Sequence, residues 1–151
     1  MILLRRNPLD FGLRWGDFKI WGRYAALVCL IAAPVLFAAS LSQPFQKYYS
    51  LENFDFIGYS LAQFASLFAS EYFFRGFLLF GLRSKLKEAS ILVQTIPFVL
   101  VHLGKPELET LSTILTGVLF GYIAYRGKSF WPAYFIHLFI NLFFVACVNL
   151  F

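Results

Sequence analysis

The chain has 151 residues, of which 60% are hydrophobic and only 14% are charged, and its mean hydropathy is +0.70. Because a soluble domain carries roughly 25% charged residues, this composition excludes an ordinary soluble protein and indicates an integral membrane protein with the lipid bilayer as a partner. The net charge of +5 does not indicate nucleic acid, since the basic residues punctuate apolar runs and form no separate patch.

Residues 1–23 combine basic and aromatic side chains and are predicted to form a cytoplasmic or interfacial segment. Phe11, Trp15 and Phe18 have helical spacing, and Trp beside Lys and Arg suits the membrane interface. We therefore expect a short juxtamembrane helix that anchors the chain. A cleavable signal is not expected, because the apolar run begins only after Arg23 and no small-residue cleavage pattern closes it.

Five apolar runs are predicted to cross or enter the membrane, where a spanning helix needs ~20 residues. They are residues 24–41, 56–82, 89–103, 111–125 and 130–151. The third run is short for a full crossing, so we expect it either to break near Pro97 or to start at depth. A polar and aromatic loop is expected at 42–55. The predicted fold class is all-α, a polytopic helical membrane protein of about five transmembrane helices.

The basic residues alternate along the chain and predict its topology. Ten of the thirteen Lys and Arg residues fall in the first, third and fifth exposed segments, two fall in the segments between, and Arg75 lies within a run. The positive-inside rule then places the N-terminus in the cytoplasm and the C-terminus outside.

One stretch of the second run, Ser70 to Gly76, carries two charges in otherwise apolar sequence. Glu71 and Arg75 stand four residues apart, so on a helix they share a face and can neutralise each other. An unpaired charge at that depth is costly, and ionisable residues within spans usually face a protein interior or a wet cavity. The pair therefore marks an interior site.

Both histidines of the chain also lie in apolar runs. His102 follows Phe98 by four, and His137 precedes Asn141 by four, so the latter two share a helix face. A lone intramembrane histidine often only ties two helices together, but two of them with a Glu–Arg pair favour a functional site. Counted from the basic turns, Glu71 and the histidines lie roughly 14 to 22 Å deep. All three can then meet in one cavity on the cytoplasmic side of the midplane or close to it.

Such a set of side chains suits peptide hydrolysis. A carboxylate and a neutral imidazole can hold and deprotonate a water, while a second histidine and an asparagine donate hydrogen bonds to the oxyanion on the attacked carbonyl. One glutamate and two histidines also form a possible zinc set. Because the sequence lacks H-E-x-x-H, we favour a site without a cofactor over a zinc site.

The motifs E-x-x-x-R, F-x-x-x-H and H-x-x-x-N follow one another from Glu71 to Asn141 on successive apolar runs. With R-G-F-L-L, G-x-x-x-G and W-P-x-x-x-x-H beside them, this order resembles the CAAX-protease and bacteriocin-processing (CPBP, Abi-type) family of intramembrane endopeptidases. The resemblance covers about residues 60–144. It implies a membrane-embedded glutamic-type protease of a bacterial-type plasma membrane, acting on a peptide or protein substrate.

The same resemblance divides the chain and assigns roles. Residues 24–55 are then the first transmembrane helix and its loop, and 56–151 the catalytic-type domain. Arg75 orients the carboxylate of Glu71, His102 helps to activate water, and His137 with Asn141 stabilises the oxyanion. Fuller members of the family carry further helices before the first motif, so the sequence leaves open whether a second copy or a partner subunit helps to wall the cavity.

Ser70 departs from the family, whose first motif usually opens with two adjacent glutamates, the first of which activates water. Three interpretations stay open. Glu71 supplies the base after a local helix shift, since adjacent helical residues point ~100° apart. Ser70 is instead a nucleophile, although the sequence shows no activating partner for it. Or the chain is an inactive scaffold or immunity protein that kept the cavity.

A proton-coupled carrier is a further class, because buried Glu and His also build proton relays. No inverted repeat supports that class. We favour hydrolysis, because the remaining motif residues are retained. An enzyme should let Glu71 share a water with His102, whereas a scaffold should hold Glu71 on Arg75 alone.

Overall fold

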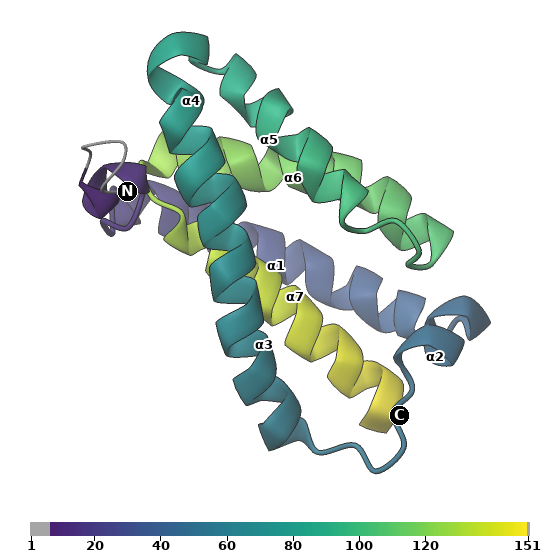
Figure 1. The fold of residues 1–151 in the computed structure, drawn as a ribbon. Helices are drawn as coiled ribbons and strands as arrows, with labels where there is room; N and C mark the ends of the chain where they lie inside the picture. Colours follow the sequence, from purple (N-terminus) through teal and green to yellow (C-terminus); the bar gives the residue numbers. More distant parts are fainter. Residues whose placement is uncertain (1–6, 151) are drawn as a thin grey trace.

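The computed structural model describes residues 7–150, and all the regular elements in that range are helices (Figure 1). Three of them are long and apolar enough to cross a membrane: α1 (Phe18–Ser40), α6 (Glu107–Gly127) and α7 (Trp131–Leu150). The predicted all-α, polytopic membrane class is therefore confirmed. The chain is an integral membrane protein.

The second apolar run forms three helical segments in direct succession. They are α3 (Phe56–Glu71), the π-helix η3 (Tyr72–Leu78) and α4 (Leu79–Leu86), and together they make the long teal rod of Figure 1. The π-helix starts directly after Glu71. Such segments are rare in proteins and frequently occur at functional sites.

The third run is shorter than predicted. Helix α5 (Ala89–Leu100) contains Pro97 without breaking there, so the expected break near Pro97 is wrong. The helix ends at Leu100, and the chain then turns through residues 101–105. His102 therefore lies in a turn, not inside the helix where the apolar run had suggested it.

The predicted juxtamembrane helix is also wrong. A 3-10 helix, η2 (Pro8–Phe11), is followed by Gly12 and Gly16 at φ values of +80° and +64°, a left-handed conformation that ends helical structure and favours glycine. Helix α1 begins at Phe18, six residues earlier than expected, because the Asp17 side chain accepts a hydrogen bond from the Ile20 amide. Arg5 and Arg6, counted above as topology signals, lie outside the described residues.

This N-terminal segment packs onto the protein itself. The Phe130 amide donates to the Gly12 carbonyl at 3.0 Å, and the Trp131 indole donates to the Leu13 carbonyl at 3.0 Å. The Asp17 amide donates to the Gly127 carbonyl at 2.8 Å. The segment therefore fastens the turn between α6 and α7.

Residues 42–55 were predicted to be a loop, but they contain a short helix. Helix α2 (Gln43–Tyr49) has Pro44 in its first turn and buries Phe45, whose ring meets the Phe144 ring edge-on at 5.1 Å. The apolar contact with α7 explains why so short a helix forms.

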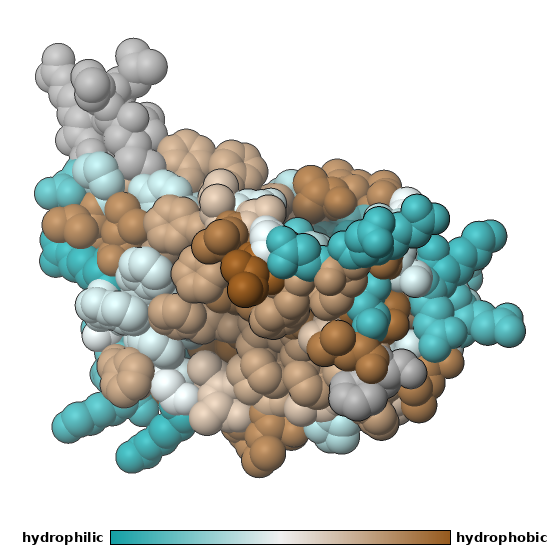
Figure 2. Space-filling model, turned by 90° about the horizontal axis from the view of Figure 1, so that it is seen from below, coloured by the Kyte–Doolittle hydropathy of each residue, from teal (hydrophilic) through white to brown (hydrophobic). Residues whose placement is uncertain are grey.

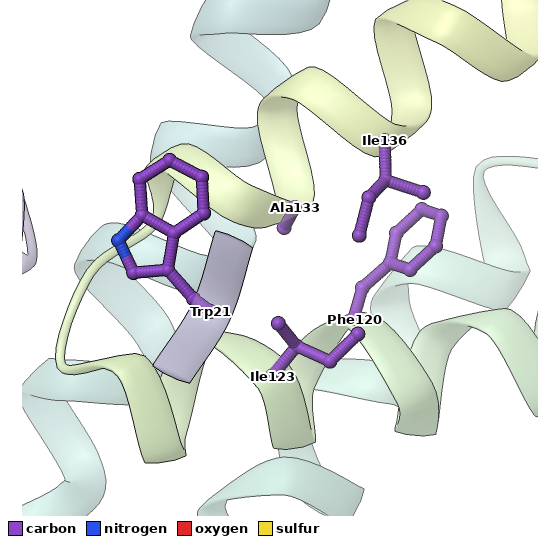
Figure 3. Close-up of a cluster of buried hydrophobic side chains, with 5 residues drawn as sticks. All are labelled: Trp21, Phe120, Ile123, Ala133 and Ile136. Carbon is purple, nitrogen blue, oxygen red and sulfur yellow. The ribbon is translucent and has the colours of Figure 1, made fainter. Parts of the chain in front are cut away.

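The helices pack as two pairs, α1 with α7 and α5 with α6, and α3 crosses onto α7 (Figure 1). A buried cluster joins the pairs, as Figure 3 shows. It consists of Trp21 from α1, Phe120 and Ile123 from α6, and Ala133 and Ile136 from α7. On the face shown in Figure 2, hydrophobic side chains occupy most of the middle and hydrophilic ones lie mainly towards the two ends, as expected for a protein surrounded by lipid.

Close contact between α5 and α6 depends on two glycines. A Cβ atom on Gly121 would lie 2.6 Å from Gln94 Nε2, and one on Gly117 would lie 2.8 Å from Thr95 Cγ2. The Gln94 amide uses this approach to donate to the Gly117 carbonyl at 2.9 Å. The G-x-x-x-G spacing thus serves helix packing, as predicted.

We expect Gly121→Ala to lower the free energy of unfolding by about 1–3 kcal/mol, the usual cost of overpacking a well-packed core. The measurement is thermal unfolding of the purified protein in detergent. Gly22→Ala in α1 is the control, because the atoms nearest to its Cβ would be Phe18 ring atoms at 3.6 Å or more, which is ordinary van der Waals contact. Equal stability of the two variants would contradict the role of Gly121.

Candidate active site

Glu71 is the last residue of α3 and is completely buried. Arg75 of η3 donates from Nη1 to Glu71 Oε1 across 2.8 Å, and neither side chain is exposed to solvent. The pair inferred from the sequence spacing is therefore present. The π-helix begins after Glu71 and contains Arg75, so it changes the position of Arg75 relative to Glu71. Ser70 and Glu71 both lie in the last, regular turn of α3.

His137, in the second turn of α7, contacts the same carboxylate oxygen. Its Nδ1 lies 2.6 Å from Glu71 Oε1. An imidazole that donates its Nδ1–H to a carboxylate has a fixed tautomer and ring orientation, and Nε2 remains as its basic atom. The side chain of His137 is 14% exposed, whereas that of Arg75 is fully buried. Of these two partners of Glu71, His137 is therefore the accessible one.

Aromatic rings surround the charged end of Arg75. The guanidinium carbon lies 3.8 Å from the centre of the Phe98 ring and 5.3 Å from that of Phe120. Such cation–π contacts compensate part of the cost of burying the charge. Within residues 7–150, Arg75 Nε and Nη2 and Glu71 Oε2 have no hydrogen-bond partner.

His102 lies beside this cluster without joining it. Its Nδ1 is 2.7 Å from the Phe98 carbonyl oxygen, and its ring centre is 6.3 Å from that of His137. The first contact explains the F-x-x-x-H spacing: His102, four residues after Phe98, forms a hydrogen bond with the Phe98 carbonyl near the end of α5. Among the described residues, the carboxylate of Glu71 bonds Arg75 and His137. This contact differs from both arrangements expected from the sequence, in which Glu71 either shares a water with His102 or bonds Arg75 alone.

Asn141, one turn after His137 on α7, is held by a residue that the motifs did not single out. The Tyr59 hydroxyl of α3 donates to Asn141 Oδ1 at 2.9 Å. With Oδ1 engaged, the amide nitrogen Nδ2 is the group that Asn141 can offer to a ligand. A tyrosine in an apolar run was the one sequence signal for this contact.

A cavity of about 180 Å³ lies against His137 and Asn141. The rest of its wall is mainly apolar and comes from α1, α2, α6 and α7, with Leu36, Ile140 and Phe144 among the lining side chains. Glu71 does not line it. The carboxylate therefore contacts His137 without lining the cavity itself. Of the candidate residues, His137 and Asn141 line the cavity.

Four further polar residues line the same cavity and were also missed: Tyr49, Lys105, Glu109 and Ser112. Lys105 Nζ lies 2.7 Å from Glu109 Oε1 and donates to the Tyr49 hydroxyl at 2.9 Å, and that hydroxyl donates to the Glu109 carboxylate at 2.8 Å. Burial, and then the neighbouring Glu109 charge, raise the pKa of the Tyr49 hydroxyl above its ordinary value. The i, i+4 spacing of Lys105 and Glu109 was the available sequence signal.

Ser70 is half-buried, and the hydrogen bonds of the described residues give its hydroxyl no basic partner. In the part of the chain that the structure describes, no group of three or more His, Cys, Asp or Glu side chains is arranged to hold a metal ion.

The comparisons with known proteins agree with the motifs. The family described as type II CAAX prenyl endopeptidase Rce1-like matches residues 24–143, a range that includes all five candidate residues from Glu71 to Asn141. No curated protein and no solved structure matches the chain. The family match covers most of the sequence and confirms the resemblance to CAAX-type intramembrane proteases. The chain belongs to the Rce1-like family of type II CAAX prenyl endopeptidases.

Proposed function

We propose that this protein is an intramembrane endopeptidase whose hydrolytic water is activated by the Glu71–His137 pair. Family membership supports the class of enzyme. The observation that carries the mechanism is the 2.6 Å contact between His137 Nδ1 and a carboxylate that is itself fixed by Arg75.

In this mechanism His137 is the general base. Glu71 accepts the Nδ1–H bond and stabilises the imidazolium that forms, while Nε2 takes a proton from a water in the cavity. The water oxygen attacks the peptide carbonyl carbon and an oxyanion forms. The C–N bond then breaks, and His137 returns the proton to the leaving amine.

Asn141 donates from Nδ2 to the oxyanion. The support is its place on the cavity wall and the Tyr59 hydrogen bond that engages its Oδ1. Preorganised donors of this kind act mainly on the transition state, because the charge they stabilise develops there. His102 lies beside His137, with their ring centres 6.3 Å apart.

These roles differ from those implied by the family resemblance, in which His102 activates water and His137 belongs to the oxyanion site. The difference rests on one contact: His137 Nδ1 bonds the carboxylate of Glu71, which can stabilise an imidazolium, whereas His102 Nδ1 bonds a neutral backbone carbonyl. A metal-free site remains part of the proposal.

The alternative is a peptide-binding scaffold or immunity protein without catalysis. The specific observation in its favour is Ser70, which stands where the family carries its water-activating glutamate. A nucleophilic Ser70 has less support, because no base contacts its hydroxyl among residues 7–150.

We expect His137→Gln to lower kcat/KM by about 10²–10⁴, the usual contribution of a general base. The assay uses purified protein in detergent and a quenched-fluorescent peptide library, and thermal unfolding verifies that the variant is folded. Glu88→Gln, an exposed carboxylate on the α4–α5 turn, should retain activity within about twofold.

Full activity in His137→Gln would contradict the assignment. An inactive wild type that gains cleavage on Ser70→Glu would instead support the scaffold.

Removing the Tyr59 hydroxyl should affect the chemical step more than binding. We expect Tyr59→Phe to lower kcat by about tenfold, less than the ~10²–10³ lost when an oxyanion donor itself is removed, with KM changed by less than about twofold. Tyr24→Phe, on the exposed side of α1, is the control. A rise in KM at constant kcat would contradict a positioning role for Tyr59.

A further inference from the structure

A second hollow adjoins the cavity at the candidate site. It measures about 820 Å³ and lies between α2 and the turn that joins α5 to α6. Phe45, Lys105 and Leu108 line both hollows. The two hollows are therefore adjacent, and we refer to them together as the groove and to these three side chains as its neck.

The outer hollow lies at one end of the molecule, where α2 and the turn between α5 and α6 are found (Figure 1). The walls of the groove come from the last turns of α1, from α2, from the first turns of α6 and, around the inner hollow, from α7. The basic turn with Arg83, Lys85 and Lys87 and the turn with Arg126 and Lys128 lie at the opposite end, beside the described start of the chain (Figure 1).

The dimensions of the inner hollow suit one large side chain. Its 180 Å³ compares with the ~150 Å³ apolar cavity that binds a benzene molecule. Most of the side chains that line it beside His137 and Asn141 are apolar, so an aromatic or large aliphatic group placed there would lose contact with water and bring the next backbone carbonyl towards those two residues.

The neck can bind peptide backbone. Lys105 donates to the Tyr49 hydroxyl and to Glu109, and an ammonium group has three N–H donors. The contacts among the described residues therefore leave one donor for a carbonyl oxygen. Because Glu109 already neutralises the lysine, the neck does not require a charged substrate.

We propose that this groove binds an extended peptide that enters from the membrane face opposite the basic turns and places one large apolar side chain in the inner hollow. By the positive-inside rule, that face is extracytoplasmic. The substrate class is then a membrane-proximal peptide segment exposed outside the cytoplasm. The identity of the occupant rests on the proposed function, whereas the side of entry does not.

The side of entry is tested by thiol labelling, which needs no activity. Ser112→Cys lines the inner hollow and Lys128→Cys marks the basic end, both in a background with Cys29→Ala and Cys147→Ala. A membrane-impermeant maleimide is applied to right-side-out and to inverted membrane vesicles. We expect each cysteine to be labelled from one side only, and the two sides to be opposite.

The groove itself is tested by filling it. Ala39→Trp projects into the inner hollow, whereas Ala38→Trp, its exposed neighbour on α1, does not line it. We expect Ala39→Trp to slow labelling of Ser112→Cys and to lower kcat/KM for library peptides by about tenfold or more, the loss of one buried apolar side chain. Ala38→Trp should change both by less than about twofold.

Labelling of Ser112→Cys from the Lys128 side, or from neither side, would overturn the proposal, and so would equal effects of the two tryptophans. Labelling as expected with no cleavage of any peptide would leave the groove in place and refute the proposed function instead.

Discussion

A buried ion pair is the constraint on which the arrangement of this site depends. Moving a carboxylate and a guanidinium out of water costs several kcal/mol per ion even after relaxation, and inside a membrane no solvent shares that cost. Glu71 and Arg75 therefore hold each other at 2.8 Å, and Phe98 from α5 covers the cation at 3.8 Å. Any rearrangement that separates them leaves an uncompensated charge in the protein interior.

The same pair brings three parts of the chain together. Glu71 ends α3, Arg75 sits in the π-helix, and His137 reaches the carboxylate from α7. The close approach of α5 and α6 at Gly117 and Gly121 then places Phe98 and Phe120 around the cation. Packing, charge burial and the orientation of the His137 imidazole are thus consequences of one cluster. This explains how a short membrane protein can keep a polar site in an apolar interior.

Several features could be predicted from sequence because they depend on local properties. Apolar runs predicted the membrane class, and the i, i+4 spacing predicted that Glu71 and Arg75 would meet. Gly117 and Gly121 predicted a close helix contact. Each of these follows from hydropathy or helical periodicity within one segment.

Other features depend on contacts between segments and could not be predicted in that way. Helical spacing of Phe11 and Trp15 suggested a helix, but Gly12 and Gly16 adopt left-handed backbone and the segment packs onto the α6–α7 turn. Helix α2 forms because Phe45 packs against Phe144 of α7, which lies far away in the sequence.

The hydrogen-bond partners of Glu71 and Asn141 also depend on contacts between segments and could not be predicted from local sequence. Two histidines were available to Glu71, and only the tertiary arrangement selects His137, whereas His102 bonds the Phe98 carbonyl near the end of α5. The pairing of Tyr59 with Asn141 joins residues 82 positions apart, and no local pattern contains it.

The measurement that tests the central claim most directly is a double-mutant cycle on kcat/KM for Glu71→Gln and His137→Gln, with each variant shown to be folded at the assay temperature. If Glu71 acts by orienting His137, the two residues work as a unit, and the double variant should be about as slow as the slower single variant. Losses that multiply would contradict the account, because they would mean that the carboxylate and the imidazole act on separate steps.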